Sequence, residues 1–170
     1  MRAALRSGWL LGGTLLAAAS QAGAGLPTAR AVALAEAPVV DGTIGAEEWS
    51  GVPLLADPFV QVEPEYGEPS PFATIVRIAQ SGGSLYVAVE AVDPDIARLA
   101  AAVTTRDGEL DQDDSVGVML DASGDKRTAT LFQTNALGTQ QDGRIADNGR
   151  TVDLRWDETW RCAVRRLDDR

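Results

Sequence analysis

The 170-residue sequence contains no histidine. Histidine is the side chain whose ordinary pKa lies closest to neutrality, and it is the base of the Ser-His-Asp and Cys-His mechanisms. Its absence excludes both mechanisms, together with every zinc site that uses an imidazole ligand.

Cysteine occurs once, at Cys162, so no disulfide can form within the chain. A reactive thiol needs a neighbour that lowers its pKa, whereas a thiol in apolar surroundings is inert. We expect Cys162 to be a buried thiol rather than a reactive one.

The N-terminal hydrophobic run, residues 9–19, is too short to span a bilayer, which takes about 20 apolar residues. It follows a short basic start with Arg2 and Arg6, and it precedes Ala22 and Ala24, which have the spacing that a signal peptidase reads. We predict a signal peptide over residues 1–24. The mature chain would then be exported to the periplasm, to the outer membrane or out of the cell.

Positive charge is scarce, since 15 Lys and Arg against 25 Asp and Glu give a net charge of −10. Such a chain repels nucleic acid and anionic lipid headgroups, and it remains compatible with neutral sugars and divalent cations. We therefore expect no nucleic-acid partner. The shortness of the N-terminal hydrophobic run in turn predicts no membrane span.

From residue 73 onward, apolar residues recur with period two, which is the pattern of half-buried strands. The expected strands cover residues 73–80, 84–93, 114–121 and 128–137. Glycine-containing segments at 81–83, 123–125 and 137–143 join them, as is typical of antiparallel hairpins. The pattern predicts an all-β fold, an antiparallel β-sandwich of jelly-roll type, over residues 36–170. Residues 25–35 would be a linker or a first strand.

Two short helices are expected beside the strands. Residues 45–49 would form one helical turn that carries Trp49 into the core. Residues 93–103 would form a helix, because Asp93 offers a cap and Pro94 suits a first turn. The chain ends at Arg170 in what reads as a strand running into a polar turn, so we expect the sandwich to be incomplete at its C-terminus.

Four segments in this order resemble carbohydrate-binding modules of family 9: VVDGTIGAEEW (39–49), SLYVAVEAVDPD (84–95), RDGELDQDDSVGVMLDASGDKRTATLFQTNALGTQQDG (106–143) and WDETW (156–160). The likeness is closest to the version found N-terminal to a large domain of unknown function in secreted or outer-membrane bacterial proteins, a domain thought to be a membrane barrel. It implies a β-sandwich that binds saccharide ends and is often attached to glycoside hydrolases. It also implies that a further strand or two follows Arg170.

The family's sugar site carries over only in part. Sugar-binding members have a tryptophan where this chain has Asp111, and a glutamate where it has Gly117. Their Arg-x-Asn corresponds here to Gln133-Thr134-Asn135, so the resemblance implies a shared role for the asparagine alone.

Sugar recognition needs a flat aromatic face and planar polar side chains. Gln133 and Asn135 lie two apart on one expected strand and so share a face. Trp156 is either a sugar platform or an edge-packing residue, and Trp160 is expected in the core. The candidate carbohydrate-binding residues are Asn135, Gln133, Trp156, Arg106 and Tyr86.

Five aspartates flank the expected strand 114–121, and its length of about 25 Å separates them into two groups. Asp111, Asp113 and Asp114 could supply oxygen ligands to a structural calcium ion, which family 9 modules are known to carry. The alternative is a solvated loop in which one aspartate caps backbone amides. Asp121 and Asp125 would belong to a turn. No other cofactor is expected, and loop aspartates in water lack the apolar wall that raises a catalytic pKa.

These observations predict a non-catalytic carbohydrate-binding module of an exported bacterial protein, associated with carbohydrate breakdown, with a saccharide or polysaccharide as its partner. The alternative is a structural or interaction domain, packed against a membrane barrel encoded beyond residue 170, that binds no sugar.

Overall fold

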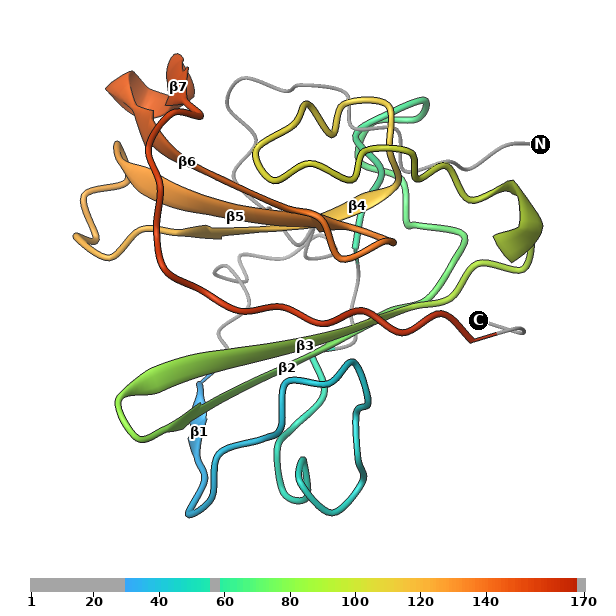
Figure 1. The fold of residues 1–170 in the computed structure, drawn as a ribbon, viewed down its shortest axis with the longest axis vertical. Coiled ribbons are helices and arrows are strands. Elements are labelled where there is room, and N and C mark those ends of the chain that lie inside the picture. The colour runs from blue at the N-terminus through green and yellow to red at the C-terminus, as the bar shows by residue number, and fades with distance from the viewer. Residues whose placement is uncertain (1–29, 56–58, 168–170) are drawn as a thin grey trace. The chain divides into compact units, whose positions relative to one another are not determined.

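The computed structural model describes residues 30–55 and 59–167. Its strands are β1 (Val32–Ala33), β2 (Thr74–Ser81), β3 (Ser84–Ala91), β4 (Ser115–Leu120), β5 (Ala129–Asn135), β6 (Gln140–Ala146) and β7 (Thr151–Asp153), and its helical turns are η1 (Ile96–Arg98) and η2 (Asp147–Gly149). One sheet has the order β1-β2-β3 and the other β4-β5-β6-β7 (Figure 1). The expected all-β class is confirmed. The predicted signal peptide lies outside the described residues.

The described residues form two compact units. Those before Asp95 hold the three-stranded sheet, and Asp95–Arg166 hold the four-stranded sheet. No helix among the described residues is long and apolar enough to cross a membrane.

In the first unit, β2 and β3 form the predicted antiparallel hairpin, with Ser81 opposite Ser84. Gly82 and Gly83 make the turn with φ of 57° and 79°, values that glycine adopts without strain. β1 adds a short parallel pairing to β2 within the segment expected to be a linker or first strand.

The core of this unit is a small cluster centred on Trp49, which is 8% exposed. Trp49 donates its backbone N–H to Gly45 O at 3.1 Å, so residues 45–49 do form one helical turn. The indole packs with Val52, Ala79 and Ala88. The predicted role of Trp49 as a core residue is confirmed.

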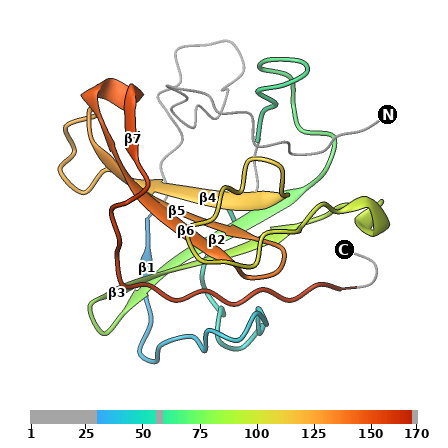
Figure 2. The same cartoon turned by 45° about the horizontal axis from the view of Figure 1, so that its top comes forward.

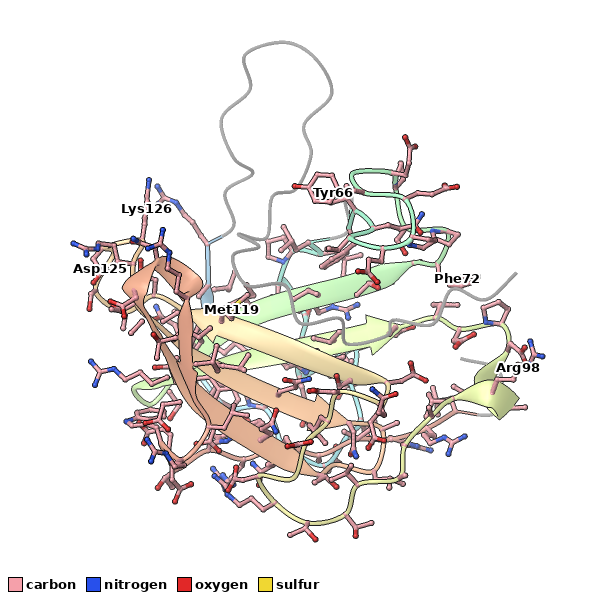
Figure 3. All side chains as sticks on the ribbon, turned by 90° about the horizontal axis from the view of Figure 1, so that it is seen from above. Tyr66, Phe72, Arg98, Met119, Asp125 and Lys126 are labelled. Carbon is pink, nitrogen blue, oxygen red and sulfur yellow. The ribbon has the colours of Figure 1, made fainter. Side chains whose placement is uncertain are left out.

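In the second unit, β4 and β5 pair antiparallel through the predicted turn around residues 123–125 (Figures 1 and 2). The Asp121 carboxylate accepts backbone N–H groups from Ser123, Asp125 and Lys126. Asp125 in turn accepts the N–H groups of Arg127 and Thr128. Figure 3 shows Asp125 and Lys126 at this exposed end. Both aspartates are turn residues, as predicted.

Two local predictions were wrong. The helix expected over 93–103 is reduced to the single turn η1, whose N-cap Asp95 makes no side-chain capping bond. Amides that a helix would bond internally are instead bonded to aspartates from the loop before β4. The segment 137–143, expected to be a connection, contains the first half of β6, because its polar side chains find partners elsewhere in the unit.

Candidate functional site

A buried aspartate fastens the loop before β4 to neighbouring backbone. Asp113 is 3% exposed. Its Oδ1 accepts the N–H of Ala102 at 3.0 Å, and its Oδ2 accepts the N–H of Val103 at 2.9 Å. Asn135 Nδ2, at the end of β5, donates to the same Oδ2 at 2.7 Å. The carboxylate thus holds residues 102–103 against the end of the sheet.

These hydrogen bonds decide the charge of Asp113. Burial by itself would raise the pKa of the carboxyl group, because desolvation penalises the charged form. The hydrogen bonds from Val103, Ala102 and Asn135 outweigh burial and hold the pKa below its ordinary value. Asp113 is therefore ionised at neutral pH.

Asn135 is 1% exposed, and its side chain is fully used within the chain. Besides Asp113, its Nδ2 donates to Val103 O at 2.8 Å, and its Oδ1 accepts the N–H groups of Leu137 at 3.0 Å and Thr139 at 2.9 Å. An asparagine side chain has two donor hydrogens and two acceptor lone pairs, and all four are taken. This corrects its assignment to a sugar site: Asn135 is a structural residue of the β5–β6 turn.

The three aspartates considered for calcium do not converge on one point. Asp113 bonds Ala102, Val103 and Asn135, and Asp114 Oδ2 accepts the N–H of Ala100 at 2.7 Å. Asp111 is half-buried. Across residues 30–55 and 59–167, no group of three or more acidic or cysteine side chains could hold a metal ion. As placed, these carboxylates fit the capping of backbone amides and do not fit a shared calcium ion.

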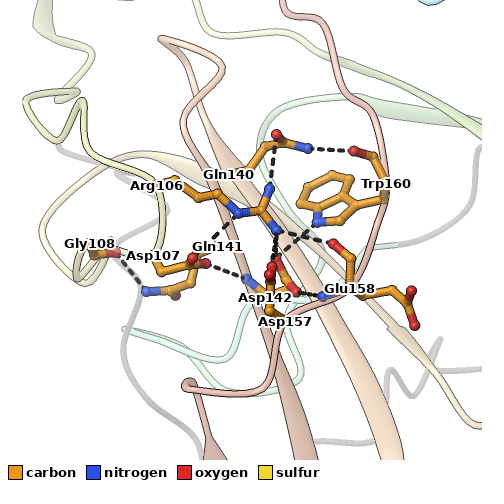
Figure 4. Close-up of polar contacts among 9 residues, drawn as sticks. All are labelled: Arg106, Asp107, Gly108, Gln140, Gln141, Asp142, Asp157, Glu158 and Trp160. Carbon is orange, nitrogen blue, oxygen red and sulfur yellow. Dashed lines mark hydrogen bonds and ion pairs between the residues drawn. The ribbon is translucent and has the colours of Figure 1, made fainter.

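A second polar cluster centres on Arg106 (Figure 4). Nη2 donates to Asp142 Oδ1 at 2.6 Å, to Asp157 Oδ1 at 2.7 Å and to the carbonyl oxygen of Glu158 at 3.1 Å. The hydrogen bond to Asp157 has the largest effect on the Arg106 pKa and raises it, against the lowering effect of burial. We call the following set the Arg106 cluster: Arg106, Asp107, Gln140, Asp142, Asp157, Glu158 and Trp160.

The remaining contacts orient the guanidinium plane. Arg106 Nη1 donates to Gln140 Oε1 at 3.2 Å, and Nε lies 3.4 Å from Asp107 Oδ2. The Arg106 side chain is nevertheless 38% exposed. It is therefore fixed in direction and still reaches solvent.

Asp142, on β6, is the buried anchor of the cluster, with an exposed fraction of 0%. Its Oδ1 also accepts the indole N–H of Trp160 at 3.0 Å, and its Oδ2 accepts the backbone N–H of Glu158 at 2.6 Å. One carboxylate thus joins three stretches of chain: the loop at 106, the strand β6 and the segment 157–160.

The two tryptophans of WDETW differ in their surroundings. Trp160 packs edge-on against Phe132 of β5, with ring centroids 5.4 Å apart and an interplanar angle of 71°. Trp160, expected in the core, is half-buried and packs on the sheet through this contact. Trp156 is half-buried and immediately precedes Asp157, so its backbone lies within about 4 Å of a residue that contacts Arg106.

The predicted sugar residues do not share one face of the sheet. Trp160 contacts Phe132, and Asp142 pairs with Phe132 across the strands, so the Arg106 cluster lies on the Phe132 face. Gln133 points to the opposite face, because side chains alternate along a strand. There it lies opposite Gly117 and donates to Ser115 Oγ at 2.8 Å.

Tyr86 belongs to β3 of the other compact unit, whereas the other four candidates belong to the Asp95–Arg166 unit. It is half-buried and packs against the cluster around Trp49 and Ala88. Cys162 is half-buried rather than buried, and its Sγ donates to Gly138 O at 3.6 Å. The structure therefore brings only Arg106 and the neighbourhood of Trp156 together.

Sequence reasoning missed Asp142, the residue that organises this cluster. Gln140-Gln141-Asp142 reads as loop because three consecutive polar residues break the alternation of a strand. Arg106, the shared partner of Gln140 and Asp142, precedes them by 34 and 36 positions. The other two partners of Asp142, Glu158 and Trp160, follow it by 16 and 18 positions. No local signal could have found them.

Comparison of the chain with protein-family models, with curated proteins and with solved structures gives no match. Among the described carboxyl groups whose pKa clearly departs from the ordinary value, Asp113, Asp125 and Asp153 are all lowered, chiefly by hydrogen bonds that oppose any burial.

Proposed function

We propose that this chain is a non-catalytic carbohydrate-binding module of an exported bacterial protein, associated with the breakdown of polysaccharides. Sequence resemblance over residues 36–170 and the all-β architecture support this assignment. We place the binding surface at the Arg106 cluster and Trp156, and leave Gln133, Asn135 and Tyr86 out of it.

The observation that carries the proposal is the fixed, half-exposed guanidinium of Arg106. Hydrogen bonds to Asp142 and Gln140 fix the guanidinium, so the binding of a ligand to it costs little side-chain entropy. Asp157 is 73% exposed and offers a planar acceptor beside it. Planar donors and acceptors at fixed angles match the paired hydroxyl groups of a pyranose ring.

Trp156 supplies the aromatic component. It is half-buried and adjacent in the chain to Asp157. A partly exposed indole buries a large apolar area when a flat ligand covers it. Saccharide recognition combines an aromatic face with fixed polar groups, and Trp156 is the tryptophan that directly precedes Asp157 in the chain.

The test is calorimetric titration of the mature chain with xylo- and cello-oligosaccharides. We expect saturable heat that Trp156→Ala abolishes. Tyr66→Ala is the matched control, because Tyr66 is an aromatic residue 80% exposed in the other compact unit (Figure 3). Binding that survives Trp156→Ala, in a protein that melts like the wild type, would contradict the placement of the site.

The second candidate function is a structural or interaction domain without sugar binding. One specific observation favours it: Asn135, the family's polar residue that this chain keeps, is buried and has no hydrogen-bonding group left for a ligand. Absence of heat with every glycan, from folded protein, would support this alternative.

A further inference from the structure

We infer that Asn148 and Gly149, in the turn between β6 and β7, form a site of spontaneous succinimide formation, and that conversion of Asn148 to isoaspartate loosens the β6–β7 hairpin. Neither residue belongs to the proposed sugar surface. Three features of the chain support the inference: the residue pair, the backbone conformation of the turn and the few contacts that hold it.

The reaction joins the backbone nitrogen of Gly149 to the side-chain carbonyl carbon of Asn148. The new C–N bond closes a succinimide ring, and the side-chain nitrogen of Asn148 leaves as ammonia. Water then opens the ring at either carbonyl and gives aspartate or isoaspartate, so no oxidant, reductant or cofactor is consumed. Glycine favours ring closure, because it has no Cβ to hinder the approach of its own nitrogen.

The chain has two asparagines, and their surroundings differ. Asn135 precedes Ala136, is 1% exposed and has every hydrogen-bonding position of its side chain occupied. Its carbonyl carbon cannot turn toward the next backbone nitrogen without breaking those bonds. Asn148 is exposed, and none of the residues that the structure describes forms a hydrogen bond with its side chain. The Asn148 amide is therefore free to rotate toward Gly149.

The backbone of this turn is strained at consecutive residues. Asp147 and Asn148 have φ of 53° and 58°, in the left-handed region that residues with a Cβ rarely adopt. Such conformations persist only where surrounding contacts hold them. Here the Asn148 N–H donates to Arg127 O at 3.1 Å, and the Arg150 N–H donates to Asp147 O at 3.3 Å. Ring closure requires ψ of Asn148 to rotate away from 41°, and this rotation leaves the strained conformation.

Conversion to isoaspartate would change the length of the turn. The main chain of isoaspartate runs through Cβ, so one backbone atom is added between Ala146 and Thr151, the pair that closes the hairpin. Hairpin register depends on turn length. The edge strand β7 has only three residues, and Thr151 Oγ1 ties it to the turn by donating to Asp147 Oδ2 at 3.2 Å. We therefore expect the added atom to weaken the pairing of β7 with β6 (Figure 1).

The test is incubation of the folded chain at mildly alkaline pH, followed by tryptic peptide mapping. Cleavage after Arg144 separates the peptide of Asn135 from that of Asn148. We expect the Asn148 peptide to gain the mass of an amide-to-acid change and to become a substrate for an isoaspartate-specific methyltransferase, while Asn135 stays intact. Because local opening of an exposed turn costs little free energy, the rate at Asn148 should lie within about tenfold of the rate in urea. Asn148→Gln, which would have to close a larger ring, should remove the modification.

The matched variant for the structural effect is freshly purified Asn148→Asp, which introduces the carboxylate without the additional backbone atom. Amide hydrogen exchange at residues 151–153 should be faster in the converted protein than in this variant. Equal exchange in the two proteins would overturn the loosening of the hairpin. An Asn148 peptide that stays unchanged in the folded chain but converts in urea would show that the fold protects the pair, and would overturn the inference altogether.

Discussion

Replacing Asp142 by asparagine should be among the most damaging isosteric changes in the Asp95–Arg166 unit. The carboxylate is completely buried and accepts hydrogen bonds from Arg106, Trp160 and Glu158. An amide keeps one acceptor oxygen and turns an NH₂ group toward the remaining donors. It also removes the buried counter-charge of Arg106.

The size of the effect follows from these contacts. Breaking a buried ion pair from one side costs about 3–5 kcal/mol. The Arg106 side chain is 38% exposed and can recover some hydration, so we expect the lower end, about 3 kcal/mol. With a urea m-value of about 2 kcal/mol/M, the unfolding midpoint should fall by about 1.5 M.

Urea titration followed by tryptophan fluorescence measures this shift, and Trp160 reports on it directly because its indole contacts Asp142. Asp157→Asn is the matched control: it removes a carboxylate from the same guanidinium, but one that is 73% exposed, so it should cost no more than about 1 kcal/mol. Equal midpoints for the two variants would refute the view that Asp142 anchors the cluster.

Three further predictions concern the same unit. Asn135→Ala should lower the free energy of unfolding by about 3 kcal/mol, because it leaves several buried groups without partners. The control Gln133→Ala should cost under about 1 kcal/mol. Urea titration measures both, and similar losses would contradict the structural role of Asn135. The pKa of Asp113 is lowered in the folded chain, so its contribution to stability is present above the unfolded pKa of about 3.9 and is lost as pH falls from there through the lower folded pKa. Asp113→Asn should therefore reduce the fall in unfolding free energy at acidic pH. An unchanged slope of unfolding free energy against pH would contradict this role of Asp113. Gly143→Ala should destabilise the folded chain, since the added Cβ would lie 2.9 Å from Leu154 Cδ2 and 3.1 Å from Asp153 O. Gly117→Ala should be neutral, because the atom nearest to its added Cβ is 3.7 Å away. A thermal melt in which Gly117→Ala loses as much stability as Gly143→Ala would contradict this packing.

The predicted hairpins were confirmed because their signals are local. Alternation of apolar residues along residues 74–81 and 84–91 and two glycines at the turn suffice to specify one antiparallel pair. The turn at Asp121 and Asp125 follows from hydrogen bonds to amides within five residues. Such features need no knowledge of the rest of the fold.

The candidate site was predicted only in fragments. Arg106 and Trp156 were selected for their chemistry, without any indication that Asp157 would connect their neighbourhoods. Gln133 and Asn135 were selected because two residues spaced by two share a face. That reasoning was sound for a strand, but it could not reveal that Asn135 is enclosed by the loop at 103 and by its own turn.

The sequence by itself determined the all-β class, the two main hairpins, the core position of Trp49 and the absence of histidine chemistry, because each depends on composition or on neighbours along the chain. Tertiary structure alone decided that residues 100–103 are not helical, that Gln140–Asp142 belong to β6 and that Asp113 and Asp142 are anchors. These outcomes depend on hydrogen bonds between residues 10 to 36 positions apart. A buried polar group is stable only where such partners converge, and the convergence is a property of the folded chain.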